Sequence, residues 1–136
     1  MFPVEQAALE NPNYRLAAWT GEHLQLTLMK IAVGDDIGLE IHPDTDQIIC
    51  VVQGCGLAMM GGEMERLQVQ KKVWCGCAVC VPADTWHNIV NIGSAPLRLY
   101  TVYAPPHHPH GTVHRTKAVA EYEEGQDSHQ SLDIRY

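Results

Sequence analysis

Two short stretches of the sequence hold the residue types that bind divalent metal ions. In the first, Glu40 and His42 lie two positions apart, and Gln47 follows the turn-forming residues 43–46. Residues two apart in a β-strand point to the same face, so Glu40 and His42 would lie side by side. In the second stretch, His87 follows a Pro-containing turn. One carboxylate, one amide and two imidazoles form a donor set that suits a first-row divalent ion.

Each of these residues also has a purely structural interpretation. A single His at the start of a strand is usually a core or surface group, and Glu40 could be an exposed strand residue. Gln is the weakest donor of the four, so Gln47 could instead orient a bound water molecule or the substrate. The prediction of a metal site therefore depends on the combination of spacings and not on any single residue.

The segments that would carry these residues follow the two-residue period of β-strands. The predicted strands are residues 22–33, 37–42, 47–54, 57–60, 65–70, 73–82, 87–93 and 96–106. Many short strands separated by Gly and Pro turns indicate an all-β sandwich or barrel. Residues 117–124 are predicted to be helical, and the first dozen residues form either a short helix or an extended arm.

Length and charge narrow the class of protein. A chain of 136 residues fits one domain. Its net charge of −7 argues against a nucleic-acid or anionic-membrane surface. No apolar stretch approaches the roughly 20 residues that cross a bilayer, and the N-terminal residues lack the pattern of a secretory signal. We expect a cytoplasmic protein whose partner is a small-molecule substrate.

The two metal-ligand stretches resemble the paired motifs of the cupin superfamily, across about residues 23–103. The first motif is Gly34, five residues, Glu40-Ile41-His42, four residues, Gln47, six residues and Gly54. The second motif is Gly76, five residues, Pro82-Ala83-Asp84, two residues, His87, three residues and Asn91. The resemblance implies a double-stranded β-helix, a jelly-roll barrel, with a short C-terminal helical tail. It further implies one domain over residues 1–136, with a tail at 104–136, and one divalent ion, Mn, Fe, Ni, Co or Zn.

Three positions depart from the family pattern. Glu40 stands where the family usually has its first His, Gln47 stands where it has Glu, and Asp84 replaces a turn Gly. The first two changes exchange the ligand types but keep one carboxylate among the four groups. A divalent ion with two neutral imidazoles, one amide and one carboxylate has the same formal charge as the usual set.

The segment 105–114 after the last predicted strand is rich in His and Pro. One interpretation is a second metal site, or a lid whose His reaches the pocket as an acid or base. The other is a solvated connector with no role in the site. It also resembles a feature of small bacterial cupins similar to mannose-6-phosphate isomerases, as does Trp19-Thr20-Gly21. On this resemblance, we assign His107 and His114 to lid or catalytic roles.

Two arginines and the oligomeric state complete the sequence-based expectations. Arg15 and Arg98 could bind a carboxylate or phosphate group, or they could be solvated surface charges. The chain resembles small cupins, which in general form homodimers. The exposed strand edges of a short N-terminal arm are also commonly covered by a partner subunit. We therefore expect a homodimer.

Three classes of function fit this pattern. The first is a metal-dependent isomerase or epimerase acting on a small sugar-like or oxygenated substrate, with Glu40 or a His of the tail moving the proton. The second is a metal-dependent dioxygenase. The third is a non-catalytic module that binds a small ligand in the barrel, because this scaffold hosts many activities.

Overall fold

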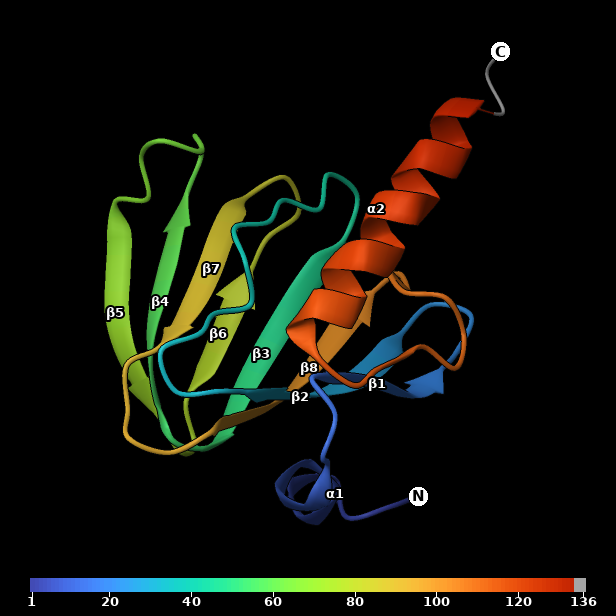
Figure 1. Ribbon diagram of the computed structural model, residues 1–136. Coiled ribbons are helices and arrows are strands. Elements are labelled where there is room, and N and C mark those ends of the chain that lie inside the picture. Colours follow the sequence, from blue (N-terminus) through green and yellow to red (C-terminus); the bar gives the residue numbers. More distant parts are fainter. Residues whose placement is uncertain (134–136) are drawn as a thin grey trace.

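The computed structural model describes residues 1–133, and the side chains of residues 1–125 (Figure 1). Antiparallel strands form most of the chain, with one helix near each end. The elements in order are α1 (Val4–Glu10), β1 (Arg15–Thr20), β2 (Gln25–Ile31), β3 (Asp46–Gln53), β4 (Cys55–Gly61), β5 (Val69–Trp74), β6 (Ala78–Val81), β7 (Trp86–Asn91), β8 (Leu97–Ala104), β9 (Val113–His114) and α2 (Lys117–Asp133).

The strands form two sheets that enclose one core. The larger sheet has the order β6-β3-β8-β2-β1-β9, and the smaller has the order β5-β4-β7. All strand pairs are antiparallel. Ile49 of β3 and Leu99 of β8 share the core with Ala58 of β4 and Ile89 of β7, so the two sheets pack face to face. The predicted all-β architecture is confirmed.

The interior of the barrel is partly polar along β2. The alternation in residues 22–33 predicts a strand that buries its Leu residues, and the strand is present but its faces are reversed. Gln25 and Thr27 are fully buried, whereas Leu24 is 46% exposed. The polar residues can face inward because they find partners there: the Thr27 hydroxyl lies 2.6 Å from the hydroxyl of Thr101 on β8.

Residues 37–42 are not the predicted strand. Gly38 has a positive φ of 89°, a conformation that interrupts a regular strand. The segment instead runs irregularly beside β7, where Glu40 forms an isolated antiparallel bridge with His87. This single bridge replaces a full ladder and still fixes where Glu40 lies.

Two other predicted elements have different bounds. The predicted strand 73–82 is split into the end of β5 and the whole of β6 by a turn in which Gly76 has a φ of 92°. The C-terminal helix begins at Lys117 as predicted, next to Thr116, whose hydroxyl accepts a hydrogen bond from the Val119 amide at 3.2 Å. It continues to Asp133, well beyond residue 124.

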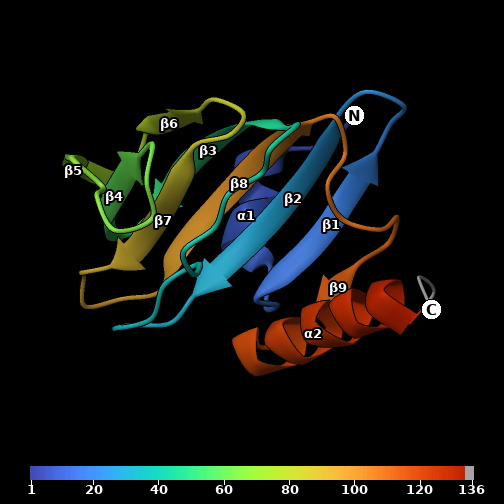
Figure 2. The same cartoon turned by 90° about the horizontal axis from the view of Figure 1, so that it is seen from above.

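The two helices lie on opposite sides of the larger sheet (Figures 1 and 2). The first dozen residues contain α1, which packs against the outer face of β8, β2 and β3 through the fully buried Ala8. Arg98 donates hydrogen bonds to the carbonyls of Ala8 at 3.4 Å and Asn11 at 2.9 Å. Arg98 therefore binds the end of α1.

α2 lies beside β9, on the side of the barrel that holds the site described below. Among the described residues, no helix combines the length and apolar character of a membrane crossing.

Two glycines of the first motif allow a matched test of the fold. Both have positive φ, but an added Cβ at Gly54 would lie 3.1 Å from the Pro96 carbonyl, whereas one at Gly34 meets no described atom within 4 Å. We expect Gly34→Ala to lower the free energy of unfolding by about 1 kcal/mol and Gly54→Ala by about 3 kcal/mol. Urea unfolding measures both, and equal losses would contradict the close packing at Gly54.

Candidate metal centre

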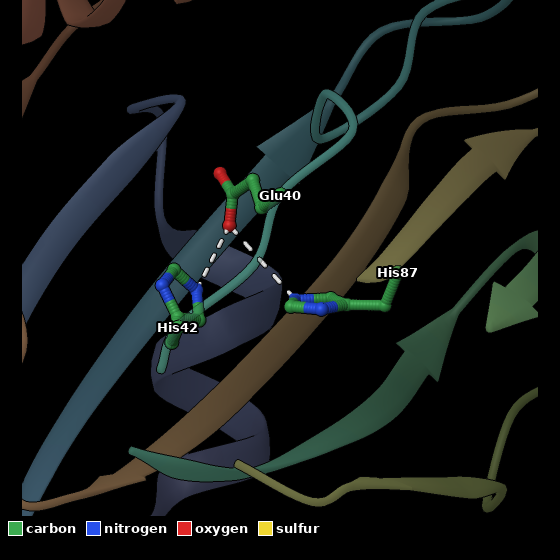
Figure 3. Close-up of side chains that lie close together, drawn as sticks. All are labelled: Glu40, His42 and His87. Carbon is green, nitrogen blue, oxygen red and sulfur yellow. Dashed lines mark ion pairs between the residues drawn. The ribbon is translucent and has the colours of Figure 1, made fainter. Parts of the chain in front are cut away.

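A backbone bridge brings the three strongest predicted ligands together. Glu40 and His42 lie on the irregular segment between β2 and β3, and His87 lies on β7. The amide of Glu40 donates to the His87 carbonyl at 3.0 Å, and the amide of His87 donates to the Glu40 carbonyl at 2.9 Å. The three side chains converge on one point inside the barrel mouth (Figure 3).

The distances suit a single ion. The Oε2 atom of Glu40 lies 3.1 Å from Nε2 of His42 and 3.9 Å from Nε2 of His87 (Figure 3). The three potential ligand atoms all lie within 4.8 Å of one another. Ligands about 2.1 Å from one ion are themselves about 3 to 4 Å apart. These three residues therefore form a candidate metal-binding group.

The imidazole nitrogens at the centre are placed to bind a cation. The Nε2 atoms of His42 and His87 are buried and form no hydrogen bond of good geometry among the described residues, and both face Oε2 of Glu40. Nδ1 of His87 lies 2.9 Å from the carbonyl of Thr85, which leaves Nε2 with its lone pair when the imidazole is neutral. Burying unpaired polar atoms is unfavourable, and a cation placed between them and Glu40 would satisfy both.

Gln47, the second residue of β3, follows His42 by five positions, and its role as a ligand stays a prediction. It is buried near the start of β3 and pairs in the sheet with Tyr103 and Val81. Its Oε1 atom is buried without a hydrogen-bond partner among the described residues. An unpaired amide oxygen is the atom that a metal ligand or a substrate-binding group would use, so this supports both interpretations of Gln47.

Arg15 and the imidazoles set the charge state of Glu40. Burial by itself raises the pKa of the Glu40 carboxyl. The adjacent His42 and the Arg15 guanidinium lower the pKa by more than burial raises it, so it lies below its ordinary value. Nη2 of Arg15 is 3.9 Å from Oε1 of Glu40, the oxygen that does not face the imidazoles. The carboxylate is therefore ionised and can bind a cation at neutral pH.

The His-rich segment reaches the centre through His107. The ring of His107 lies 4.1 Å from that of His42 and 5.6 Å from that of the buried Tyr103. Burial and the neighbouring His42 lower the pKa of His107 to about 4, and burial and Arg15 lower that of His108 to about 2. Burial and the Glu40 charge raise the pKa of Tyr103 to about 12. At neutral pH these three groups are therefore uncharged.

His114 lies further from the centre. Its Nδ1 is 3.2 Å from Nη1 of Arg15, and its Nε2 is 2.9 Å from Oε2 of Glu123. It is thus linked to the metal centre through Arg15 and Glu40, and its ring lies 6.5 Å from that of His108. The structure brings Glu40 and His107 to the centre and places His114 as a buried link between Arg15 and α2; the catalytic roles of all three stay predictions.

Gln25 positions the His-rich segment and was missed by the sequence reasoning. The Oε1 atom of Gln25 accepts hydrogen bonds from the amides of His107 at 3.0 Å and His108 at 2.8 Å. Its Nε2 donates to the His108 carbonyl at 2.8 Å and to Thr20 at 3.0 Å. The sequence offered no signal for this role, because Gln25 falls in the polar half of the alternation and its partners lie 82 and 83 residues away.

The sequence of this barrel matches one family model. The model described as "Cupin domain" matches residues 27–103, which is more than half of the chain. The chain belongs to the cupin family. The predicted double-stranded β-helix with a C-terminal helix is thereby confirmed.

Two relatives share about half of the residues of this cupin. The protein YrkC of Bacillus subtilis (strain 168) is 50% identical over 117 residues, which cover 86% of this chain and 63% of YrkC. The chain thus spans less than two thirds of that relative. The crystal structure of BH2720 from Bacillus halodurans is 52% identical, with a TM-score of 0.89, and covers 90% of this chain and 92% of BH2720.

A more distant solved structure shares the fold alone. The structure of KdgF from Halomonas sp. has a TM-score of 0.60 at 22% identity, over 68% of this chain and 80% of that chain. The barrel is therefore preserved where most side chains differ, and the function must be argued from the residues at its mouth.

Replacing Gln25 tests how the His-rich segment is held. In Gln25→Leu, the two amides and one carbonyl of the segment lose their partner in a buried place, so we expect a loss of about 2 to 4 kcal/mol in unfolding free energy. Hydrogen exchange at His107 and His108 should rise in the variant. Unchanged exchange at both amides would contradict the positioning role.

The two imidazoles of the His-rich segment, whose pKa values are lowered although His107 is exposed and His108 only half-buried, predict a loss of stability in acid. His107 and His108 have folded-state pKa values of about 4 and about 2, below the value of 6.5 in the unfolded chain. Between these values the unfolded state binds more protons, so the free energy of unfolding falls as the pH is lowered from 6.5. Above pH 4.5, the ordinary value for Glu, Glu40 adds little to this slope.

Urea unfolding from about pH 7 to about pH 4.5 measures this effect. The double variant His107→Gln, His108→Gln should show a shallower decline than the wild type. His23→Gln removes an exposed imidazole and is the control. A decline in the double variant as steep as in the control would assign the acid sensitivity to other groups.

Proposed function

We propose that this cupin is a metal-dependent enzyme that acts on a small sugar-like or oxygenated substrate by isomerase-like or epimerase-like chemistry. The observation that carries the proposal is the pair of buried, unpartnered Nε2 atoms of His42 and His87 facing the ionised Glu40. A carboxylate and two imidazoles inside the barrel stabilise the fold less than apolar residues of similar size would, so their presence indicates a binding role.

Glu40, His42 and His87, with Gln47 as the proposed fourth ligand, would hold one divalent ion, Mn, Fe, Ni, Co or Zn. When bound, this ion would supply Lewis-acid polarisation of a carbonyl or enediolate oxygen of the substrate. Its identity within that group is an outcome of the experiment below.

The residues around the centre provide groups that hold or move a proton. The neutral His107 lies against His42 and can accept a proton from a substrate carbon at its free ring nitrogen. Tyr103 keeps its phenolic proton at neutral pH and lies 3.4 Å from Nε2 of His108, so it can donate a hydrogen bond. Gln25 holds the segment that carries both imidazoles.

The choice of an isomerase class rests on the resemblance of the His-rich segment to cupins similar to mannose-6-phosphate isomerases, and that assignment stays a prediction. The dioxygenase and the non-catalytic binding module remain alternatives that the experiments separate. The homodimer and the cytoplasmic location also stay predictions.

Metal binding by variants tests the centre. We expect protein purified without added metal, or titrated with Mn, Fe, Ni, Co and Zn, to bind one ion per chain by elemental analysis and calorimetry. His42→Ala, His87→Ala and Glu40→Ala should each lower the affinity by about 100-fold or more, and Gln47→Ala by about tenfold, as befits a weaker donor. His110→Ala, at an exposed position, is the control.

Two results would contradict the centre. One is that the His42 and His87 variants retain the metal with wild-type affinity. The other is that the wild type binds none of the five ions.

Proton exchange tests the reaction class. With small hydroxy-carbonyl compounds in D2O, an isomerase-like enzyme should incorporate deuterium at the carbon next to the carbonyl, detected by NMR, and His107→Gln should slow this incorporation. Oxygen uptake without deuterium incorporation would instead support the dioxygenase. Ligand binding with neither would support the non-catalytic module.

A further inference from the structure

A buried arginine lies directly behind the candidate metal centre. Arg15, the first residue of β1, is 2% exposed, and its Nε atom has no hydrogen-bond partner among the described residues. It lines a cavity of about 210 Å3 together with Glu40 and Glu124. The two oxygens of Glu40 divide their contacts: Oε2 faces the imidazoles, and Oε1 faces the Arg15 guanidinium.

Two carboxylates of α2 cover the same positive groups from the solvent side. Oε1 of Glu124 lies 3.1 Å from Nη1 of Arg15, although the Glu124 side chain is 51% exposed. Oε2 of Glu123 lies 2.9 Å from Nε2 of His114, whose other ring nitrogen contacts Arg15. The guanidinium therefore already binds a carboxylate, and this carboxylate belongs to a side chain that reaches in from solvent.

The first half of α2 makes little apolar contact with the barrel. Within residues 117–125, whose side chains are described, only Ala120 is buried. The start of the helix is held by Lys117, which pairs with Asp35 at 2.9 Å and with Asp36. Arg15 is buried but Glu124 is half exposed, so solvent reaches one side of their ion pair. An anion that takes the place of Glu124 keeps the buried guanidinium paired, which avoids the cost of an unpaired buried charge.

The charge balance indicates what would replace the helix carboxylates. With neutral imidazoles, a divalent ion, Arg15 and Glu40 together carry two positive charges. Glu123 and Glu124 neutralise these charges while α2 covers the mouth. A ligand that takes the place of the two glutamates must itself be anionic to restore the balance.

We propose that the substrates of this cupin are short carboxylic acids, and that Arg15 binds their carboxylate in the position that Glu124 occupies in the structure. A planar guanidinium matches a carboxylate through its fork of donors, and Nη1, which lies 3.1 Å from Oε1 of Glu124, is the donor that a ligand carboxylate would take over. Glu124 also lines a second cavity of about 250 Å3 together with His107 and His108, so a short ligand whose carboxylate takes the place of Glu124 can extend toward the imidazoles of the mouth. That the ligand also reaches a bound metal rests on the proposed function. That Arg15 binds a carboxylate rests on its contact with Glu124.

Calorimetric titration with malonate tests the exchange, using the full chain loaded with Mn. Glu124→Gln removes the competing carboxylate, so it should bind malonate about tenfold more tightly than the wild type. Glu121→Gln is the matched control, because it removes the same charge from α2 and lines the same cavity but forms no ion pair among the described residues. It should bind malonate within about twofold of the wild type. Equal effects of the two variants would overturn the proposal.

Variants of Arg15 test the other partner. Arg15→Gln should weaken malonate binding at least about tenfold, and Arg15→Lys, which keeps the charge but not the fork of donors, should weaken it by an intermediate factor. Circular dichroism establishes that each variant is folded, and Arg15→Lys serves the test where Arg15→Gln does not fold. Wild-type affinity in Arg15→Lys together with tighter binding of inorganic phosphate than of malonate would also overturn the assignment of a carboxylate.

Hydrogen exchange separates this proposal from the metal site. Malonate should increase exchange at the amides of residues 118–124 in both metal-free and Mn-loaded protein, because it releases Glu124 from Arg15. If the chain binds no metal but malonate still loosens α2, the proposed function fails and the anion site stands. If the chain binds Mn but malonate leaves α2 exchange unchanged, the anion site fails and the metal centre stands.

Discussion

The partly buried carboxylate of Glu40 is the group on which the mouth of the barrel depends. One of its oxygens faces the imidazoles of His42 and His87, and the other faces the guanidinium of Arg15. A buried negative charge is costly unless positive groups surround it, so each of these residues must hold its place for the others to be stable. The reciprocal backbone hydrogen bonds between Glu40 and His87 fix this geometry without a regular strand.

Around this centre, the chain adds two layers from the same C-terminal region. The His-rich segment supplies His107 next to His42 and is held by the buried Gln25. α2 then supplies Glu124, which reaches Arg15 from the solvent side. The His-rich segment is held by hydrogen bonds to the buried Gln25, whereas Glu124 is half exposed, so the carboxylate of α2 is the group that a ligand can replace. This difference links the structure of the mouth to access to the site.

Some expectations from the sequence failed at the site itself, and the reason is physical. The alternation along β2 indicated a strand with its Leu residues inside, but Gln25 and Thr27 face inward because their hydrogen-bond partners lie on β8 and in the His-rich segment. The pattern in residues 37–42 indicated a strand that the positive φ of Gly38 interrupts. In both places a tertiary interaction outweighs the local pattern, as is common at functional sites.

The sequence by itself determined the all-β barrel through strand period, and the family and the candidate ligands Glu40, His42 and His87 through motif spacing, because both are local properties of the chain. Only the tertiary structure decided the surroundings of that centre. Arg15 was open to interpretation as a surface charge, and its contacts with His114 and Glu124 span 99 and 109 residues. Contacts over such distances depend on how the helix and the sheets pack, and no local pattern encodes them.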